Sequence, residues 1–207
     1  MFYLVRSPWW LRLVYPRRIW DMKGDGKRIY LTFDDGPNPE VTPFVLDELA
    51  KYDARATFFC IGKNRLQYPK VYDRIISEGH AVGNHSFDHL DGWKTNPVVY
   101  VDNVLKAKLD IASDLFRPPY GKLSCIQHQQ LTKLGYKTIM WSVLSGDFDE
   151  STSAEQCCRH VIKNAGDGAI VVFHDSTKAG EKVSYTLPLV LKHFAEKGYR
   201  FDKIVLE

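Results

Sequence analysis

Apolar and polar positions along this chain follow two different periods. Short runs rich in β-branched and aromatic residues, bounded by polar or glycine-containing segments, predict buried strands. The predicted strands are Ile29–Phe33, Ala56–Ile61, Ala81–Gly83, Leu115–Arg117, Lys137–Val143, Ala169–Phe173 and Tyr199–Leu206.

The segments between these strands have helical spacing. Thr42 and Pro43 predict an N-cap and a first helical residue, and Gly79 predicts the end of the second helix. The predicted helices are Phe44–Tyr52, Pro69–Glu78, Val98–Leu115, one from Ser124 to about Gly135, Ser153–Ala165 and Thr186–Glu196. Strands that alternate with helices indicate a mainly parallel sheet. Periodicity leaves open whether this sheet is doubly wound or closed into a barrel.

The first 24 residues, called here the N-terminal arm, differ in composition from the rest. They are aromatic and basic, and Gly24-Asp25-Gly26 separates them from a domain over residues 25–207. Arginines and prolines interrupt the arm, so we expect neither a signal peptide nor a membrane span. It either packs on one end of the domain or contacts a membrane peripherally through residues 1–23. We therefore predict a cytoplasmic location, with the inner membrane surface as one alternative.

Composition narrows the function classes. A chain of 207 residues with a net charge of +3 predicts one globular domain and gives no reason to expect nucleic acid as a partner. None of the four cysteines has the spacing of a zinc site. We expect all four to be reduced, with Cys60 in the core, as in a reducing compartment.

Candidate metal ligands follow two of the predicted strands. Asp34 and Asp35 end the first strand, and His85 and His89 follow the third. Histidines four residues apart share one face of a helical turn and can bind one divalent ion. Two histidines and one aspartate leave room for water, as in catalytic zinc sites, although ferrous iron accepts the same set. Ser86 cannot act as a base, so the base is expected from the paired aspartates, of which one binds the metal and the other stays free to take a proton. Alternatively, these residues form an ordinary turn and a surface helix.

Two further strands end in candidate catalytic residues. Arg117 could orient a carboxylate, and His174 could act as a general acid near neutral pH. The alternatives are a solvated arginine in a rigid loop and a structural histidine. Because all these positions follow the carboxyl ends of strands, they can converge on one face of the fold.

The order of these motifs resembles the polysaccharide deacetylase family, also known as the NodB-homology domain or carbohydrate esterase family 4. The motifs are T-F-D-D-G at 32–36, H-S-x-x-H at 85–89 and R-P-P-Y-G at 117–121, followed by His174, and the resemblance covers about residues 28 to 205. It implies an α/β fold, a distorted (β/α) barrel with about seven parallel strands.

The resemblance also implies a role for each residue. Ser86 would support the histidine loop. The remaining roles are Asp34 as general base, Asp35, His85 and His89 as ligands of one divalent metal, most often zinc (Zn2+), Arg117 as the residue that positions the base, the Tyr120 backbone amide as an oxyanion donor, and His174 as general acid.

The fourth motif departs from the family pattern. A D-x-x-D-W-like run is typical there, whereas this chain has Leu144-Ser145-Gly146-Asp147-Phe148. Asp147, the residue that would tune His174, is retained. Leucine and phenylalanine replace the first aspartate and the tryptophan, and Val172 stands where leucine is common. The altered pocket wall leaves the identity of the substrate open.

These features predict a metal-dependent hydrolase that removes N-acetyl groups from an N-acetylglucosamine-type saccharide and releases acetate. The same residues could instead cleave an O-acetyl ester or a non-sugar amide, and a catalytically silent saccharide-binding barrel is a further alternative. An intracellular or lipid-linked saccharide precursor would suit the predicted location. No arm residue belongs to the catalytic set, so we expect deletion of Met1 to Trp20 to leave activity on a soluble substrate unchanged.

Overall fold

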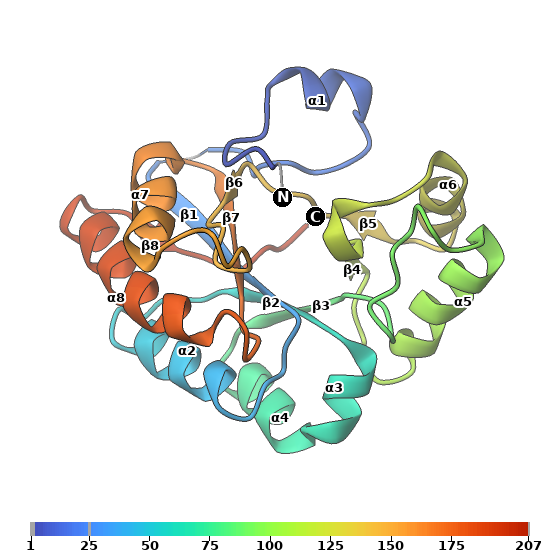
Figure 1. The fold of residues 1–207 in the computed structure, drawn as a ribbon, viewed down its shortest axis with the longest axis horizontal. Helices are drawn as coiled ribbons and strands as arrows, with labels where there is room; N and C mark the ends of the chain where they lie inside the picture. The colour runs from blue at the N-terminus through green and yellow to red at the C-terminus, as the bar shows by residue number, and fades with distance from the viewer. Residues whose placement is uncertain (1–2, 25, 207) are drawn as a thin grey trace.

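A curled parallel sheet lies at the centre of the computed structural model, and helices cover its outer side (Figure 1). The structure describes residues 3–24 and 26–206; residues 1–2, Asp25 of the predicted domain boundary and Glu207 lie outside it. The strands are β1 (Arg28–Asp34), β2 (Thr57–Cys60), β3 (Ala81–Asn84), β4 (Leu115–Phe116), β5 (Lys137–Thr138), β6 (Val143–Leu144), β7 (Ala169–His174) and β8 (Arg200–Phe201).

The strand order is β5-β4-β3-β2-β1-β7-β6, and β8 pairs with the start of β1. The distorted barrel of about seven parallel strands is therefore confirmed. One predicted strand, Lys137–Val143, is wrong as a single element. Its two ends belong to β5 and β6, which lie at opposite ends of the strand order, so the barrel has a seam between them.

The helices are α1 (Trp10–Val14), α2 (Val41–Ala50), α3 (Gly62–Gln67), α4 (Pro69–Ser77), α5 (Pro97–Lys108), α6 (Cys125–Lys133), α7 (Ala154–Asn164) and α8 (Gly180–Glu196), with a 3-10 turn, η1 (Pro119–Gly121). Ser124 and Ser153 start α6 and α7 with capping boxes, as their sequences predict. Both α1 and α3 were missed, since each is only five or six residues long.

Three helix boundaries differ from the prediction. Thr42 lies inside α2 and is not its N-cap, because the Asn38 side chain accepts the N–H groups of Glu40 and Val41 and starts the helix earlier. Helix α5 ends at Lys108, well before Leu115. Helix α8 begins at Gly180, and Pro188 within it interrupts the pattern that marks a helix start.

Alternation along β1 decides what enters the barrel. Ile29, Leu31 and Phe33 belong to the large core between the sheet and the outer helices. Tyr30 packs in a separate cluster with residues of β2 and β7. Burying each large apolar side chain stabilises the fold by about 1.5–3 kcal/mol, so this register is strongly held. The same register directs Asp34 to the barrel side of β1.

The N-terminal arm fills the seam of the barrel. It packs on the domain, as one of the two alternatives proposes, and Trp20 is only 6% exposed. Four backbone hydrogen bonds join it to both sides of the seam: Leu144 N to Val5 O (2.8 Å), Ser7 N to Ser142 O (3.0 Å), Ile19 N to Thr138 O (2.9 Å) and Met140 N to Ile19 O (2.7 Å). These bonds satisfy backbone groups that an open edge would expose.

Among residues 3–24 and 26–206, no helix combines the length and apolar character needed to cross a bilayer. Cys60 is buried in the main core, as predicted, and Cys125 is the exposed member of the four free cysteines.

Candidate active site

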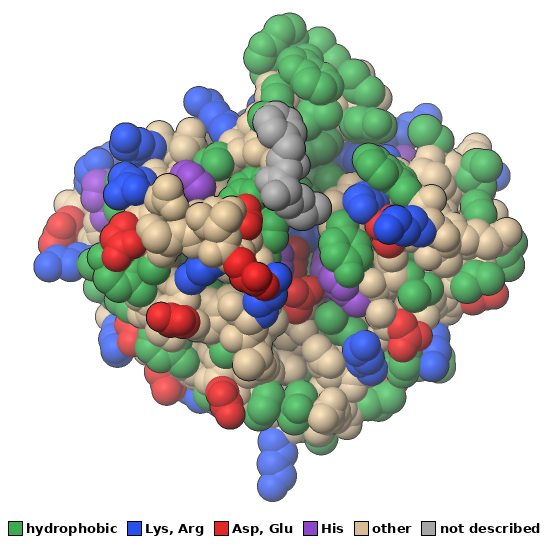
Figure 2. All heavy atoms as spheres, viewed as in Figure 1, with side chains coloured by type: hydrophobic (Ala, Val, Ile, Leu, Met, Phe, Trp, Pro, Cys, Tyr) green, Lys and Arg blue, Asp and Glu red, His purple; other side chains and the backbone are tan. Residues whose placement is uncertain are grey.

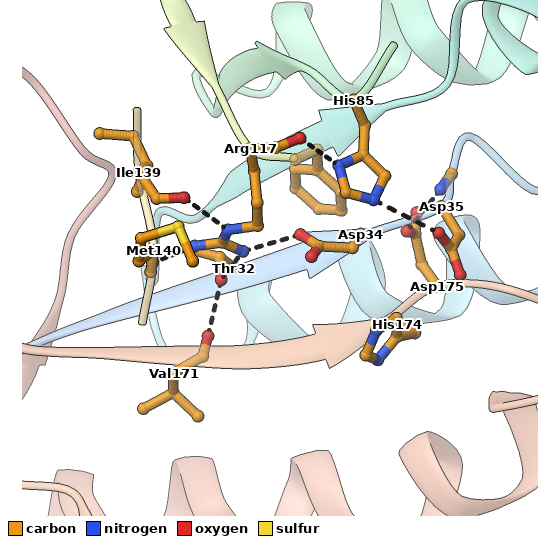
Figure 3. Close-up of polar contacts among 12 residues, drawn as sticks. Thr32, Asp34, Asp35, His85, Arg117, Ile139, Met140, Val171, His174 and Asp175 are labelled. Atoms are coloured by element: carbon orange, nitrogen blue, oxygen red, sulfur yellow. Dashed lines mark hydrogen bonds and ion pairs between the residues drawn. The ribbon is translucent and has the colours of Figure 1, made fainter. Parts of the chain in front are cut away.

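A buried ion pair joins the ends of β1 and β4. Arg117 has no exposed surface, and its Nη1 donates to Asp34 Oδ1 at 2.7 Å and to Thr32 Oγ1 at 2.7 Å (Figure 3). The Thr32 hydroxyl in turn donates to Val171 O. The alternative of a solvated arginine is therefore wrong, and Arg117 is placed to orient the Asp34 carboxylate.

The rest of the Arg117 guanidinium is also satisfied. Its Nε donates to Ile139 O at 3.3 Å and its Nη2 to Met140 O at 2.9 Å, while the ring of Phe59 lies 4.1 Å from its central carbon. Burial lowers the pKa of Arg117, and the negative charge of Asp34 acts against that shift. The pair thus compensates the cost of burying each charge alone.

Asp35, His85 and His89 offer three ligand atoms within 4.8 Å of one another. Nε2 of His85 lies 3.6 Å from Asp35 Oδ1, and Nε2 of His89 lies 3.1 Å from the same oxygen. That oxygen is buried and accepts no hydrogen bond from the described residues. Such an orphaned carboxylate oxygen facing two imidazole nitrogens fits a divalent cation.

Contacts on the far sides of both rings suit metal binding. His85 Nδ1 lies 2.8 Å from the carbonyl oxygen of Arg117, which can only accept, so this nitrogen carries the proton and Nε2 keeps its lone pair. His89 Nδ1 lies 3.2 Å from the Tyr120 hydroxyl. Burial lowers the pKa of His85 to about 4, which leaves the ring neutral at pH 7, the form that binds metals.

The ionisation of Asp35 suits the same role. Burial opposes its charge, but the close approach of His89 and the nearby positive charge of His174 hold the pKa of Asp35 below its ordinary value. The side chain is therefore a carboxylate at neutral pH.

The two histidines do not share a helical turn, contrary to the sequence-based expectation. The segment that carries them is a loop in which Ser86 and His89 have left-handed backbone angles (φ 62° and 58°). Asn84 and Asn103 hold this loop: Asn84 Oδ1 accepts Ser86 N–H, and Asn103 Oδ1 accepts the N–H groups of the next two residues. Sequence reasoning missed both asparagines, since only the folded loop brings them to these amides.

Ser86 contributes through its backbone. Its carbonyl accepts Gly62 N–H at 2.9 Å, whereas its hydroxyl has no hydrogen-bond partner among residues 3–24 and 26–206. The predicted support of the histidine loop by the Ser86 side chain therefore does not involve a hydrogen bond from its hydroxyl to a described residue.

His174 and Asp147 form the second charged pair of the site. His174 ends β7 beside Asp34 in the β1–β7 register. Its Nδ1 donates to Asp147 Oδ1 at 2.7 Å, and its backbone N–H donates to Asp147 Oδ2 at 2.7 Å. Burial acts to lower the pKa of His174, but the charge and hydrogen bond of Asp147 outweigh burial and raise this pKa to about 10. At neutral pH the ring is an imidazolium, ready to act as an acid.

A residue of the N-terminal arm packs against the altered fourth motif. The centroid of the Phe148 ring lies 5.2 Å from that of His174, and the centroid of the Tyr3 ring lies 5.1 Å from that of Phe148. The Tyr3 hydroxyl lies 2.9 Å from Thr152 Oγ1. Tyr3, at the far end of the sequence from this loop, thus covers the smaller aromatic that stands at the tryptophan position.

Tyr120 lies at the mouth of the site, in η1. Its backbone is left-handed (φ 59°), and its side chain is 56% exposed. The N–H groups of Gly121 and Lys122 donate to carbonyls, whereas the Tyr120 N–H has no acceptor among the described residues. That N–H is therefore free to donate to a bound substrate.

Asp175 is a residue of this region that sequence reasoning left without a role. It is fully buried; its Oδ1 accepts Gly36 N–H at 3.0 Å, and its Oδ2 accepts the Thr42 hydroxyl. Burial raises the pKa of Asp175 to about 7. The loop after Asp35 is thereby fixed to the end of β7. Its position next to His174 was the only signal in the sequence.

All the residues assigned from the sequence meet at one end of the barrel. Figure 3 shows Asp34, Asp35, His85 and His174 gathered where their strands end. A carboxylate held by arginine, a three-ligand cation site, a free amide donor and an imidazolium can together activate water, hold an oxyanion and protonate a leaving group.

The chain is similar in sequence to known proteins. The family model for polysaccharide deacetylase matches residues 21–139, more than half of the chain. A peptidoglycan-N-acetylglucosamine deacetylase of Bacillus cereus is 34% identical over 188 residues, which cover 88% of this chain and 88% of that protein. A chitooligosaccharide deacetylase of Azorhizobium caulinodans is 36% identical over 160 residues, covering 74% of this chain and 76% of that protein.

The same likeness holds in three dimensions. The crystal structure of a peptidoglycan N-acetylglucosamine deacetylase superposes with a TM-score of 0.87 at 27% identity, over 96% of this chain and 95% of that one.

Proposed function

The chain belongs to the polysaccharide deacetylase family, and on that premise we propose that it is a metal-dependent hydrolase that removes N-acetyl groups from an N-acetylglucosamine-type saccharide. The observation that carries this proposal is the convergence of Asp34, the Asp35-His85-His89 set and His174 at one end of the barrel. The names of the two relatives support an N-acetylated saccharide as the substrate class.

One divalent metal, which we propose to be zinc, would be held by Asp35, His85 and His89, and when bound it supplies Lewis acidity to the acetyl carbonyl and to a water. The neutral His85 ring and the orphaned Asp35 oxygen support this assignment.

The side chains of this protein then divide the proton transfers. Asp34, oriented by Arg117, takes a proton from the water that attacks the acetyl carbon. The Tyr120 N–H donates to the oxygen on which negative charge develops. His174 gives its Nε2 proton to the amine as the carbon–nitrogen bond breaks, while Nδ1 stays bonded to Asp147. The products are acetate and a free amino sugar.

Two alternatives make different predictions. The same machinery could cleave an O-acetyl ester or a non-sugar amide, because both have an acyl carbon open to attack by water. A silent saccharide-binding barrel would bind sugars without turnover, and the intact acid and base argue against it.

The decisive experiment measures acetate release from an N-acetylated chitooligosaccharide, a peptidoglycan fragment and an O-acetylated xylo-oligosaccharide. We expect release from an N-acetylated substrate, loss of release with a chelator, and recovery when zinc is added back. Metal content is measured in the same preparation. Release from the ester alone would support the esterase alternative, and binding without release in the metal-loaded protein would support the silent barrel. Cell fractionation tests the cytoplasmic location that the sequence predicts.

A further inference from the structure

The outer part of the N-terminal arm projects from the body of the molecule as an apolar tip, defined here as Trp9, Trp10, Leu13 and Val14. Figure 1 shows α1 standing clear of the barrel, and Figure 2 shows hydrophobic side chains gathered over it. Trp9 is 72% exposed and Leu13 is 70% exposed. A group of exposed hydrophobic side chains on a projection is typical of a surface that contacts a membrane or another molecule.

A pocket of about 420 Å³ lies at the base of the tip, between residues 14–18 and one face of α6. Val14 lines it on the side of the tip, so the pocket and the tip share an edge. Arg17, Arg18 and His128 contribute the charged and titratable side chains, and Cys125 lines it from the start of α6. No acidic residue is among the residues that line this pocket.

Arg18 is built into the wall of this pocket. It is nine-tenths buried, with 7% of its surface exposed. Its guanidinium carbon lies over the Tyr15 ring, 4.2 Å from the ring centroid. Its Nη2 donates to Leu123 O at 3.1 Å, and its Nε has no hydrogen-bond partner among the described residues. Burial lowers the pKa of Arg18, so an anion in the pocket would offset the cost of burying this cation.

The arm has a net positive charge, the same sign as the charge of Arg17 and Arg18 in the pocket. It carries five basic residues against one acidic residue, whereas the net charge of the whole chain is only +3. The acidic residue, Asp21, pairs with Arg12 at 2.5 Å. Arg17 in the pocket lining and Arg6, whose backbone bridges Val143 at the seam, are both exposed.

We propose that the arm is a docking surface for an anionic lipid bilayer, in which the apolar tip enters the headgroup layer and the pocket lined by Arg17 and Arg18 receives a lipid phosphate. Tryptophan and leucine beside arginine is the composition of interfacial membrane anchors. The aliphatic Leu13 and Val14 suit acyl chains, whereas a saccharide would favour aromatic rings alone. This surface is independent of the proposed deacetylase activity.

Vesicle co-sedimentation tests the proposal with the full chain. Vesicles of phosphatidylcholine are compared with vesicles that also contain phosphatidylglycerol, and we expect binding to the anionic vesicles that weakens with salt. Leu13→Ser should reduce binding about tenfold, through the lost apolar burial. Arg17→Gln should reduce it about fivefold, the effect of one basic residue near such a surface.

Matched controls use exposed residues elsewhere. Leu109 is 84% exposed, and Leu109→Ser should bind as the unmodified chain does. Arg159→Gln, at an exposed position of α7, is the control for Arg17→Gln. All four variants should keep unchanged acetate release on a soluble saccharide, which shows that they are folded.

Cys125 reports on the pocket itself. It is the exposed free cysteine, whereas Cys60, Cys157 and Cys158 are buried, so it should react with a maleimide, and Cys125→Ser should remove that reaction. Anionic vesicles should slow the reaction at least threefold, and phosphatidylcholine vesicles should not.

Four outcomes would overturn the proposal: equal binding to both kinds of vesicle, no binding, equal loss of binding in Leu109→Ser, or self-association that Leu13→Ser abolishes in the absence of lipid. Protection of Cys125 by inorganic phosphate together with no vesicle binding would instead indicate a site for a soluble anion, and it would equally exclude the bilayer.

Discussion

Arg117 donates to Asp34 at 2.7 Å from a side chain with no exposed surface. The arginine is held by two carbonyls of the segment that follows β5, and one of these residues, Met140, bonds to Ile19 of the arm. The orientation of the candidate base therefore depends on a chain of contacts that extends from β1 to the N-terminal arm.

Asp34→Asn should abolish most turnover and keep the metal. Asparagine retains an oxygen that can accept from Arg117, but it cannot take a proton from water. Loss of a general base typically costs about a hundred- to ten-thousand-fold in rate. Steady-state kinetics and metal analysis on the same sample check this, and a near-normal kcat would exclude Asp34 as the base.

Arg117→Lys should destabilise the protein and lower kcat. One ammonium group cannot replace the donors that now reach Asp34, Ile139 and Met140, so buried acceptors lose their partners. We expect a loss of roughly 3–5 kcal/mol in the free energy of unfolding, measured by denaturant titration. Arg74→Lys, at a partly exposed surface ion pair, is the control and should change stability by about 1 kcal/mol or less.

His89→Ala should lower the metal content of the purified protein and leave its secondary structure unchanged. The variant removes one of three ligand atoms at a partly exposed loop position. Elemental analysis and circular dichroism measure the two effects, with His193→Ala on α8 as the matched histidine control. Full metal occupancy in His89→Ala would show that the ligand assignment is wrong.

Most of the site could be predicted because its residues lie at, or directly after, the carboxyl ends of strands. In a parallel sheet the ends of β1, β4 and β7 meet at one edge, so Asp34, Arg117 and His174 had to converge once those strands were assigned. Thr32 and Asp175 could not be predicted, because their partners are far away in sequence and only packing brings them together.

The barrel seam shows where periodicity fails. Residues 137–143 contain no glycine or proline and are rich in β-branched and apolar side chains, which is typical of one strand, yet the chain leaves the sheet after Thr138 and returns at Val143. The arm pairs with both edges there. An element completed by a segment more than a hundred residues away leaves no local signal.

Tyr3→Ala should reduce kcat/KM on a soluble substrate by roughly two- to tenfold, the equivalent of about 0.5–1.5 kcal/mol for one aromatic pair. The variant uncovers Phe148 and admits water beside His174. Trp9→Ala, at an exposed position, is the control for Tyr3→Ala. Equal activity in the Tyr3→Ala and Trp9→Ala variants would show that Tyr3 does not contribute to the site.

The seam contacts also change the sequence-based expectation for the arm. Deletion of Met1 to Trp20 should lower the melting temperature, because Trp20 is buried.

Asp147→Asn should move the alkaline limb of the kcat/KM–pH profile to lower pH. The pKa of His174 is raised from 6.5 to about 10 by the charge and hydrogen bond of Asp147, against the effect of burial. Without that charge, burial acts alone and lowers the pKa of the acid. The alkaline limb should follow His174, although a limb of this profile is a macroscopic property of the coupled site.

The pH dependence of the free energy of unfolding is a second test of the His174–Asp147 pair. Because the folded pKa of His174 is above its ordinary value of 6.5, the pair stabilises the native state fully below about pH 6.5. This contribution is lost as the pH rises towards about 10. Urea titrations at pH 6 and pH 10 should therefore differ less in Asp147→Asn than in the unmodified protein. Glu150→Gln, at an exposed position three residues away, is the control. An alkaline limb that stays in place in Asp147→Asn, or that persists in a residually active His174→Ala, would separate this pair from the acid step.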